Sequence, residues 1–369
     1  MDLARCLAER GRYTVAPNPL VGAVIAQDGK VVGEGWHSRA GDRHAEIFAL
    51  DEAGEGASSR ATMYVTLEPC NHHGRTPPCV EAILKAGISR VVVGYLDPDP
   101  RMRGRSVELL RDAGVEVEVL DDPAFERQNE QFFHHMRTGR PFVHLKLATT
   151  LDGRIAAAGG DSKWVTGEDA RSRAHGLRAE AGAVLVGANT VRTDDPMLTA
   201  RGLPSNPPRI TRVVLDPHLT TSHESKLANS AREAPVLLFA GRPALDGREE
   251  KLEVRGVEVV AAPVSEEGMD LRFVLEEIGG RAIKGLLVEG GGETATRFVR
   301  EGLADKMTLF YAPKLLGAEG VPMIGALRAT KVAEALQFSV SDVEKVGTDV
   351  AVTLYPGVAG EEERVHRAC

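Results

Sequence analysis

The first part of the chain alternates between apolar runs typical of strands and segments with helical spacing. Two such runs, 21–26 and 30–36, flank the turn dipeptide Asp28-Gly29, which indicates a β-hairpin. Residues 44–54 have the spacing of a helix that ends on a glycine. Further strands are expected at 62–68, 90–96 and 115–120, with helices at 79–87 and 104–114. The pattern predicts a three-layer α/β unit whose sheet is mostly parallel after the hairpin.

A second alternation of strands and helices begins near residue 141. The segment 123–139 is amphipathic, ends on a glycine and predicts a connector helix. Later strands are expected at 141–153, 183–187, 212–216, 235–240, 257–262, 285–291 and 306–317. We therefore expect two α/β domains, at 1–140 and 141–357, followed by a charged, mobile tail at 358–369.

Composition narrows the class of protein. The 369 residues are 43% hydrophobic and 27% charged, as in ordinary globular proteins. A net charge of −8 argues against a nucleic-acid partner, which usually needs a basic face. No apolar run reaches the ~18 residues of a membrane span, and the N-terminus lacks the apolar core of a secretory signal. Four cysteines are too few for a disulfide scaffold, so we expect a cytoplasmic protein. The oligomeric state stays open, a homo-oligomer included.

The segment 67–79, LEPCNHHGRTPPC, combines cysteines, histidines and prolines in an unusual density. A disulfide between Cys70 and Cys79 is geometrically feasible, but a reducing compartment disfavours it. The alternative is a metal site. In this interpretation Cys70 ends a strand and Cys79 begins a helix, whose N-terminus favours thiolate. His44 adds a third metal ligand. Two thiolates and one histidine leave the fourth zinc position open, which is typical of catalytic zinc.

Glu46 stands two residues after His44, where it would lie beside the metal without binding it. It is then placed to carry protons from water to a leaving amine, and zinc in such a site makes water reactive at neutral pH. His-x-Glu followed by Pro-Cys-x-x-Cys is the pattern of nucleobase deaminases, although here eight residues separate the cysteines. Taken alone, His-x-Glu is usually a solvated pair and two such cysteines are usually unrelated. Their combination in chain order favours the zinc site.

The motif TLEPC, followed by HHGRTPPC and preceded by APNPLVG at 16–22, resembles the bifunctional riboflavin-biosynthesis deaminase/reductase family. That family has the expanded cysteine spacing. The later segments KLATTLDGRIA, DSKWVTG and GANTVRTDDPMLTAR resemble its second half, so the likeness covers residues 10–356. The resemblance implies a cytidine-deaminase-like domain that binds Zn²⁺, followed by a dihydrofolate-reductase-like domain that uses NADPH.

The first domain offers further candidates for substrate binding. The Asn18 amide has both a donor and an acceptor for the edge of a pyrimidinone. In the resembled family this asparagine and the loop after the fourth strand hold the substrate, and here that loop includes Asp97. Asp99 departs from the asparagine of the family pattern, which leaves its role open.

The loop between the two cysteines adds basic and histidine side chains. Arg75 is a candidate contact for a ribose phosphate, with a solvated arginine as the equally weighted alternative. His72 and His73 either contact the substrate or stay exposed.

The second domain lacks G-x-G-x-x-G, but three glycines lie between an expected strand and a helix at Gly290–Gly292. Such a turn suits a phosphate at a helix N-terminus, and a plain tight turn is as common. The resemblance implies cofactor contacts from Ala148, Trp164, Thr190, Asp194, Gly291, Gly292, Glu293, Thr294, Ala295, Thr296 and Arg297. It implies substrate contacts from Ser162, Arg178, Leu198, Arg201 and Glu289.

The chemistry of these side chains fits a reductase. Arg178 and Arg201 can clamp a ribose phosphate, because the planar guanidinium matches phosphate oxygens. Trp164 can stack on a ring, unless it is a core tryptophan. Lys146 and Glu289 are the candidate acid–base groups that would protonate an imine before hydride arrives. A salt bridge between these two is the alternative.

The sequence therefore predicts a bifunctional enzyme of riboflavin synthesis. The first domain would hydrolytically deaminate 2,5-diamino-6-ribosylamino-4(3H)-pyrimidinone 5′-phosphate, and the second would reduce the ribosyl side chain to ribityl with NADPH. The rival interpretations are a nucleoside or tRNA deaminase with an unrelated appended domain, and a zinc-stabilised binding protein.

Overall fold

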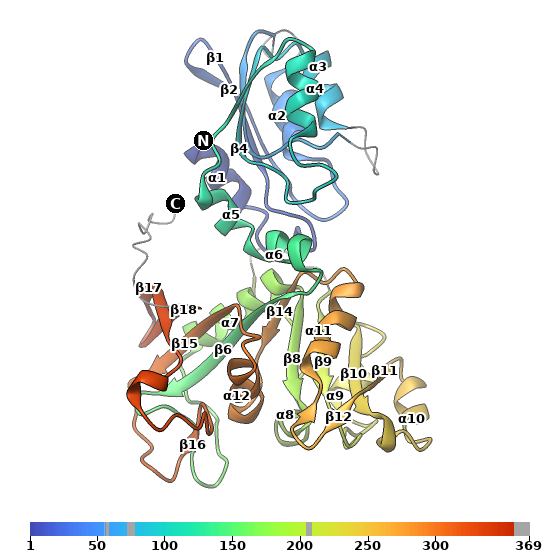
Figure 1. Ribbon diagram of the computed structural model, residues 1–369, viewed down its shortest axis with the longest axis vertical. Coiled ribbons are helices and arrows are strands. Elements are labelled where there is room, and N and C mark those ends of the chain that lie inside the picture. The colour runs from blue at the N-terminus through green and yellow to red at the C-terminus, as the bar shows by residue number, and fades with distance from the viewer. Residues whose placement is uncertain (55, 57–58, 72–77, 204–208, 358–369) are drawn as a thin grey trace. The chain divides into compact units, whose positions relative to one another are not determined.

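The chain folds into two compact units, Met1–Gly139 and a second that begins at Arg140 (Figure 1). The structure is a computed structural model that describes residues 1–54, 56, 59–71, 78–203 and 209–357. The predicted tail at 358–369 lies outside the described residues. No helix in the described ranges is long and apolar enough to cross a bilayer.

The first unit is built on a single mixed sheet. Its elements are α1 (Asp2–Glu9), β1 (Gly22–Gln27), β2 (Lys30–Trp36), α2 (Ala45–Ala53), β3 (Thr62–Leu67), α3 (Cys79–Lys85), β4 (Arg90–Tyr95), α4 (Arg105–Asp112), β5 (Glu116–Val119), α5 (Pro123–Gln128) and α6 (Glu130–Thr138). The five strands lie in the order β2-β1-β3-β4-β5. β1 is antiparallel to β2 and β3, whereas β3, β4 and β5 are parallel. This confirms the predicted hairpin and the mostly parallel sheet.

Helices cover both faces of this sheet. α2, α3 and α4 pack on one face over the apolar side chains of the parallel strands, and α1 and α5 pack on the other (Figure 1). Contact between α2 and β2 depends on two glycines. A Cβ at Gly33 would lie 2.1 Å from the carbonyl oxygen of Ala49, and one at Gly35 would lie 2.2 Å from that of Ala45. This close approach fixes the start of α2, where His44 and Glu46 lie.

The connector was predicted as one helix over 123–139, and this was wrong in one respect. The structure has two helices, α5 and α6, which meet at Asn129. The buried Asn129 side chain accepts a hydrogen bond from the Leu20 N–H (2.7 Å) and donates one to the Leu20 carbonyl (2.9 Å). An asparagine that bonds a distant backbone segment in this way competes with helix continuity. The break therefore anchors the segment that carries Asn18.

The second unit contains a larger sheet with two small ribbons. Its elements are β6 (Phe142–Thr150), β7 (Arg154–Ala156), α7 (Glu168–Ala181), β8 (Ala183–Gly187), α8 (Ala188–Asp194), β9 (Thr211–Leu215), α9 (Lys226–Asn229), β10 (Val236–Gly241), η1 (Arg242–Ala244), α10 (Glu249–Glu253), β11 (Glu258–Ala262), β12 (Val264–Ser265), β13 (Gly268–Met269), α11 (Leu271–Gly280), β14 (Gly285–Val288), α12 (Gly292–Arg300), β15 (Lys306–Ala312), β16 (Val321–Pro322), η2 (Val332–Glu334), β17 (Phe338–Val346) and β18 (Asp349–Pro356).

The main sheet has nine strands in the order β11-β10-β9-β8-β14-β6-β15-β18-β17. The strands from β11 to β15 in this order are parallel, and β18 and β17 are antiparallel. Each expected strand of the second domain is present. β17 and β18 were not predicted, because few of their side chains are fully buried, which weakens the apolar signal.

Two helical layers enclose the parallel strands. α11 and α12 pack on one face, while α7, α8, α9 and α10 pack on the other. β8 runs directly into α8, and its neighbour β14 runs into α12 through Glu289 and the glycines (Figure 1). In open α/β sheets, ligands bind outside the carboxyl ends of the strands. This edge is where the second candidate site forms.

Candidate active sites

Three side chains in the first unit converge as a metal-binding group. The ligand atoms of His44, Cys70 and Cys79 all lie within 4.8 Å of one another. The His44 Nδ1 is 3.2 Å from the Cys79 Sγ and 3.4 Å from the Cys70 Sγ. A histidine and two thiols at these separations suit a tetrahedral zinc with one open position.

Secondary-structure ends bring these ligands together. His44 immediately precedes α2, and Cys79 is the first residue of α3, as predicted. Cys70 lies three residues beyond the last residue of β3 rather than at the strand end. The backbone N–H of Cys79 donates to the Cys70 sulfur (3.3 Å), and that of Val80 donates to the Cys70 carbonyl (3.2 Å). Helix α3 thus directs its N-terminal donors at Cys70, which favours a thiolate there.

The charge state of the group suits a cation. A hydrogen bond from the Cys79 thiol, opposed by burial and aided by His44, lowers the pKa of Cys70 to about 4. The same bond and burial raise the pKa of Cys79. The bond to Cys70 also raises the pKa of His44. A sulfur that is anionic before any metal arrives makes the set a ready ligand for a divalent ion.

Glu46 lies next to these ligands and is almost fully buried, with 3% of its surface exposed. Its Oε2 has no hydrogen-bond partner among the described residues. Burial and the nearby Cys70 charge raise the pKa of its carboxyl group. A buried carboxylate oxygen without a partner is costly in a finished core and indicates a missing polar ligand. The site therefore fits zinc and a reacting water.

Sequence reasoning missed His37, which follows β2 directly. The Asn18 Nδ2 lies 3.1 Å from the His37 Nε2, and the His37 Nδ1 lies 3.1 Å from the Arg43 carbonyl oxygen. Since the Asn18 nitrogen donates, the His37 Nε2 accepts and Nδ1 carries the proton. Burial lowers the pKa of His37, which keeps the ring neutral. The ring also meets His44 edge-on at 5.7 Å, so His37 links Asn18 to the metal group.

The loop after β4 carries Asp97 and Asp99. The Asp97 carboxylate accepts a hydrogen bond from the Asp99 N–H (2.8 Å), and the buried Asp99 binds Arg101 through both carboxylate oxygens. The carboxyl ends of β3 and β4 are adjacent, which brings this loop to the same sheet edge as Cys70. Three other candidates, His72, His73 and Arg75, lie outside the described residues.

The second unit has a charged cluster around Glu289, at the end of β14. Arg178 binds its carboxylate through two nitrogens, at 2.5 Å (Nε–Oε1) and 2.9 Å (Nη2–Oε2). The Lys146 Nζ is 3.9 Å from the Glu289 Oε2. The salt bridge between Lys146 and Glu289 is thus present, with Arg178 as the tighter partner. One carboxylate with two cations leaves a positive charge for an anionic ligand.

Burial and mutual charge set the protonation of this cluster. Burial lowers the pKa of Lys146, and the charge of Glu289 offsets this only in part. Burial alone would raise the pKa of Glu289, but the charges of Arg178 and Lys146 outweigh it and lower that pKa. Glu289 therefore stays ionised, while Lys146 gives up its proton more readily than an ordinary lysine.

His175, which the sequence did not single out, connects the two predicted phosphate-binding arginines. Its Nδ1 donates to the Thr199 carbonyl (2.8 Å), and the same carbonyl accepts from the Arg178 Nη1 (3.0 Å). The His175 Nε2 then accepts from the Arg201 Nε at 3.4 Å. Burial lowers the pKa of His175, followed by the charge of Arg178. A neutral imidazole thus separates two cations that would otherwise repel each other.

Two helix N-termini meet beside this cluster. Gly187 precedes α8 and Gly291 precedes α12, and β8 and β14 are neighbours in the sheet. A Cβ at Gly187 would lie 3.0 Å from Thr294 Oγ1, whereas Gly291 has open space around it. The first N–H groups of α12 have no partner within the helix. An open glycine at such a terminus fits the pyrophosphate of a dinucleotide.

The remaining predicted cofactor residues differ in accessibility. Trp164 is 64% exposed and stacks with Arg171 rather than lying in the core, which removes the alternative of a core tryptophan. Thr296 is buried and binds Gly292 and Gly325. Arg297 bonds to the Met269 carbonyl and to Glu301, and Ala295 is buried. Contacts from these three to a cofactor would come from the backbone.

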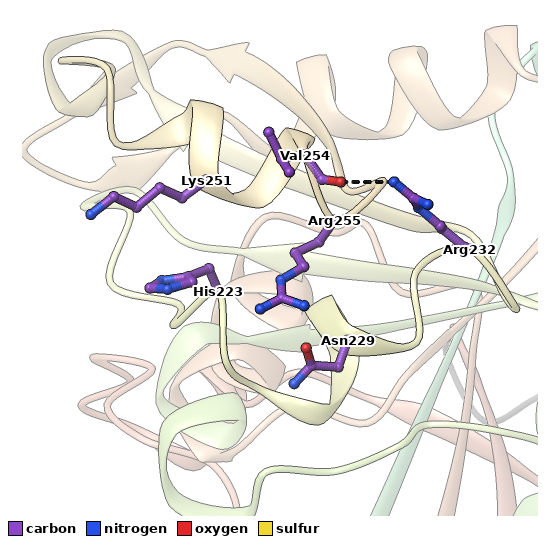
Figure 2. Close-up of a pocket in the computed structure, with 6 residues that line it drawn as sticks. All are labelled: His223, Asn229, Arg232, Lys251, Val254 and Arg255. Atoms are coloured by element: carbon purple, nitrogen blue, oxygen red, sulfur yellow. Dashed lines mark hydrogen bonds between the residues drawn. The ribbon is translucent and has the colours of Figure 1, made fainter.

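Other predicted residues flank the same region. Ala148 lies on β6, Thr190 and Asp194 on α8, and Leu198 follows that helix with a φ of 50°. Ser162 is half-buried, and Glu293, on α12, is exposed. A separate cavity of about 550 Å³ lies between α9 and α10 (Figure 2). It is lined by His223, Asn229, Arg232, Lys251, Val254 and Arg255, and none of the predicted site residues belongs to it.

Comparison with known proteins assigns both halves. The family model of the cytidine and deoxycytidylate deaminase zinc-binding region matches residues 1–95, and that of the RibD C-terminal domain matches residues 141–352. A riboflavin biosynthesis protein RibD of Aquifex aeolicus is 44% identical over 353 residues, covering 95% of this chain and 96% of the relative. The chain belongs to the RibD family.

Solved structures of RibD proteins have the same fold as this chain. An Acinetobacter baumannii RibD superposes with a TM-score of 0.87 at 38% identity, covering 96% of this chain and 97% of that one. A Thermotoga maritima protein described as a diaminohydroxyphosphoribosylaminopyrimidine deaminase/5-amino-6-(5-phosphoribosylamino)uracil reductase gives 0.83 at 36% identity, covering 96% and 97%. The predicted fold class is confirmed.

Membership of the RibD family settles the class of activity. The chain is a bifunctional enzyme of riboflavin biosynthesis with a deaminase and a reductase domain, and its cofactors are Zn²⁺ and NADPH. An unrelated appended domain is excluded, because the RibD C-terminal family covers the second unit. A binding protein without turnover is excluded because both halves match the enzyme domains of the RibD family.

Proposed function

We propose that this chain deaminates 2,5-diamino-6-ribosylamino-4(3H)-pyrimidinone 5′-phosphate and then reduces the ribosyl group of the product to ribityl. The observation that carries the proposal is a three-ligand metal group, formed by His44, Cys70 and Cys79, which leaves a fourth position open beside the unpartnered Glu46 oxygen. The Thermotoga maritima relative, which is described as a deaminase and reductase, supports the same pair of steps. The partner is a small phosphorylated molecule rather than nucleic acid, in keeping with the net charge of −8. We also infer a cytoplasmic location, where a site of two thiols stays reduced.

In the deaminase half, each residue has a separate task. His44, Cys70 and Cys79 would hold zinc, which would act as a Lewis acid and make water reactive at neutral pH. Glu46 takes a proton from the attacking water and delivers it to the departing amino group. The Asn18 amide holds the heterocycle edge and is itself oriented by His37. The products are the pyrimidinedione and ammonia.

In the reductase half, the charged cluster binds and protonates the substrate. NADPH would supply the hydride, and the N-terminus of α12 beside Gly291 would hold its pyrophosphate. Arg178 and Arg201 bind the ribose phosphate. Lys146 donates a proton to the imine nitrogen of the opened ribosylamine, which makes its carbon a better hydride acceptor. Glu289 holds Lys146 and Arg178 in place through its carboxylate.

A two-stage assay tests this function. The purified enzyme is given the diaminopyrimidinone phosphate without NADPH, and ammonia is followed. NADPH is then added, and loss of its absorbance is followed. Ammonia release in the first stage, followed by NADPH oxidation in the second, is expected. Ammonia that appears only after NADPH has been added and oxidised would reverse the proposed order, and an absence of both signals would reject the substrate.

Zinc removal should abolish deamination alone. One zinc per chain is expected from the one such ligand group found among the described residues. Cys70→Ser and Cys79→Ser should each lose the metal, because serine is a poor zinc ligand at neutral pH. Elemental analysis and ammonia release measure the effect. If a variant keeps full zinc occupancy and full deaminase activity, the cysteine that it lacks is not a zinc ligand.

Arg178→Lys should weaken substrate binding in the reductase step. Lysine keeps the charge but loses the fork that binds Glu289 and reaches a phosphate. A charged hydrogen bond is worth about 1.5–3 kcal/mol, so kcat/KM should fall about 10–100-fold, mainly through KM. Steady-state kinetics with the pre-deaminated substrate measure this, and deamination serves as the internal control. An unchanged reductase KM would remove Arg178 from the substrate site.

A further inference from the structure

Glu68, the glutamate of the LEPC motif, has no part in the chemistry described so far. It lies one residue beyond β3, and only 5% of its surface is exposed. It forms no ion pair within the part of the chain that the structure describes. A buried carboxylate without a cation must be stabilised by hydrogen-bond donors. Its donors are all backbone N–H groups of one distant segment, the loop after β4 and the first turn of α4.

These donors come from both ends of the loop between β4 and α4. The Glu68 Oε2 accepts from the Asp97 N–H (3.1 Å) and from the Gly104 N–H (2.9 Å). The Oε1 accepts from the Ser106 N–H (3.0 Å). One side chain thus closes the loop 97–104 at its start and its end. The Glu68 N–H also donates to the Tyr95 carbonyl (2.9 Å), which ties the two strand ends together.

Two further carboxylates extend this order through the loop. The Asp97 carboxylate accepts from the Asp99 N–H (2.8 Å), and the Asp99 carboxylate accepts from the Arg101 N–H (2.9 Å). Asp97 and Asp99 therefore each fix the backbone two residues further along the loop. The first bond in this series is the one from Asp97 to Glu68.

Glu68 also replaces the missing cap of helix α4. Gly104 is the N-cap residue and has no side chain to accept from the first turn. The Glu68 carboxylate receives the Ser106 N–H instead and places a negative charge at the helix N-terminus, where the helix dipole favours it. The helix and the loop before it are thus held by one group on β3.

We propose that Glu68 is a positioning residue of the deaminase site, acting through Asp97. Glu68 stands two residues before Cys70, so it couples the segment that carries a zinc ligand to the loop that carries a predicted substrate contact. This inference rests on the proposed deamination, in which Asp97 contacts the substrate. Glu68 sets the distance between Asp97 and the metal group without touching the substrate itself.

The test is Glu68→Gln, which preserves shape and burial. Glutamine has a single acceptor oxygen, so it cannot accept from Ser106 and from the pair Asp97 and Gly104 at once, and its NH₂ group would face an N–H in either orientation. The bonds that remain would also be weaker, because the amide oxygen carries no charge. Amide hydrogen exchange at Asp97, Gly104 and Ser106 should accelerate. KM for deamination should rise about 10–100-fold, the usual effect of removing a partner that orients a site residue. Zinc content, kcat and reduction of the pre-deaminated substrate should stay close to wild type.

A double-mutant cycle separates positioning from general loss of stability. Asp97→Asn removes the charge that Glu68 positions, so adding Glu68→Gln to it should raise KM little further. Ile25→Val, a change in the core on β1, should lower the melting temperature without changing KM. If Glu68→Gln does not fold, Glu68→Asp provides the test, because it keeps the charge but shortens the reach.

Two results would overturn the inference. The first is faster amide exchange at the loop with an unchanged KM, which would make Glu68 purely structural. The second is additive KM effects in the double mutant, which would mean that Glu68 does not act through Asp97. Failure of the wild-type enzyme to release ammonia would instead reject the proposed function. The exchange measurement at the three amides would then still show whether Glu68 holds the loop.

Discussion

Replacing Glu46 with glutamine is expected to abolish deamination while zinc binding and NADPH-dependent reduction persist. Glutamine has almost the same shape but cannot accept a proton and pass it on. Deamination needs this transfer twice, from water and then to the leaving amine. A positioned acid–base group contributes roughly 10²–10⁴-fold to the rate, so ammonia release should fall by that factor. The reductase site lies in the other unit and has its own charged cluster.

Three measurements on Glu46→Gln distinguish a proton carrier from a ligand. Zinc content should match wild type, unlike in His44→Ala. Ammonia release should be lost, and oxidation of NADPH with pre-deaminated substrate should be preserved. Glu108→Gln, the same chemical change on the exposed side of α4, is the matched control and should retain both activities. Zinc loss in Glu46→Gln would show that Glu46 is a ligand.

Lys146→Met is expected to produce the converse pattern, with reduction lost and deamination intact. Methionine keeps the length and the apolar stem but has no proton to donate to the imine. The reductase rate should therefore fall by roughly 10²–10⁴-fold. Lys251→Met is the control, because Lys251 is exposed and lies on α10, away from the predicted site residues.

The pH dependence of the wild-type reductase provides a second measurement on Lys146. The protonated amine is the active form, so kcat/KM should decline as pH rises through its pKa. Because burial lowers the pKa of Lys146, this decline should begin below the ~10.4 of an ordinary lysine. The residual activity of Lys146→Met should lack this alkaline decline. If the decline persists in Lys146→Met, it reports the titration of another group.

Features encoded by local sequence were predictable. The hairpin follows from a turn dipeptide between apolar runs, and the parallel strands follow from apolar segments between helices. His44 and Cys79 stand at helix starts and Cys70 follows a strand by three residues, so the order of motifs in the sequence indicated that they would meet. The structure brings their ligand atoms together. Their role as zinc ligands follows the family and stays a prediction for each residue.

Features that depend on distant partners were not predictable from one sequence. Nothing near Asn129 indicates that its amide binds Leu20 and divides a helix. His37 matters because its ring reaches Asn18 and the Arg43 carbonyl, and Glu68 matters because it holds a loop about thirty residues away. Such roles are set by tertiary contacts, which hydrophobic periodicity does not encode.

Complementation between two variants, each lacking one of the two activities, tests the central claim that one chain performs two consecutive steps at separate sites. Full-length Glu46→Gln and Lys146→Met are each incubated with the diaminopyrimidinone phosphate and NADPH, alone and as a mixture, and the ribityl product is measured by mass spectrometry. We expect no product from Glu46→Gln, an unreduced deaminated intermediate from Lys146→Met, and ribityl product from the mixture. A mixture that yields no ribityl product, although each variant is folded and retains its other activity, would contradict the account.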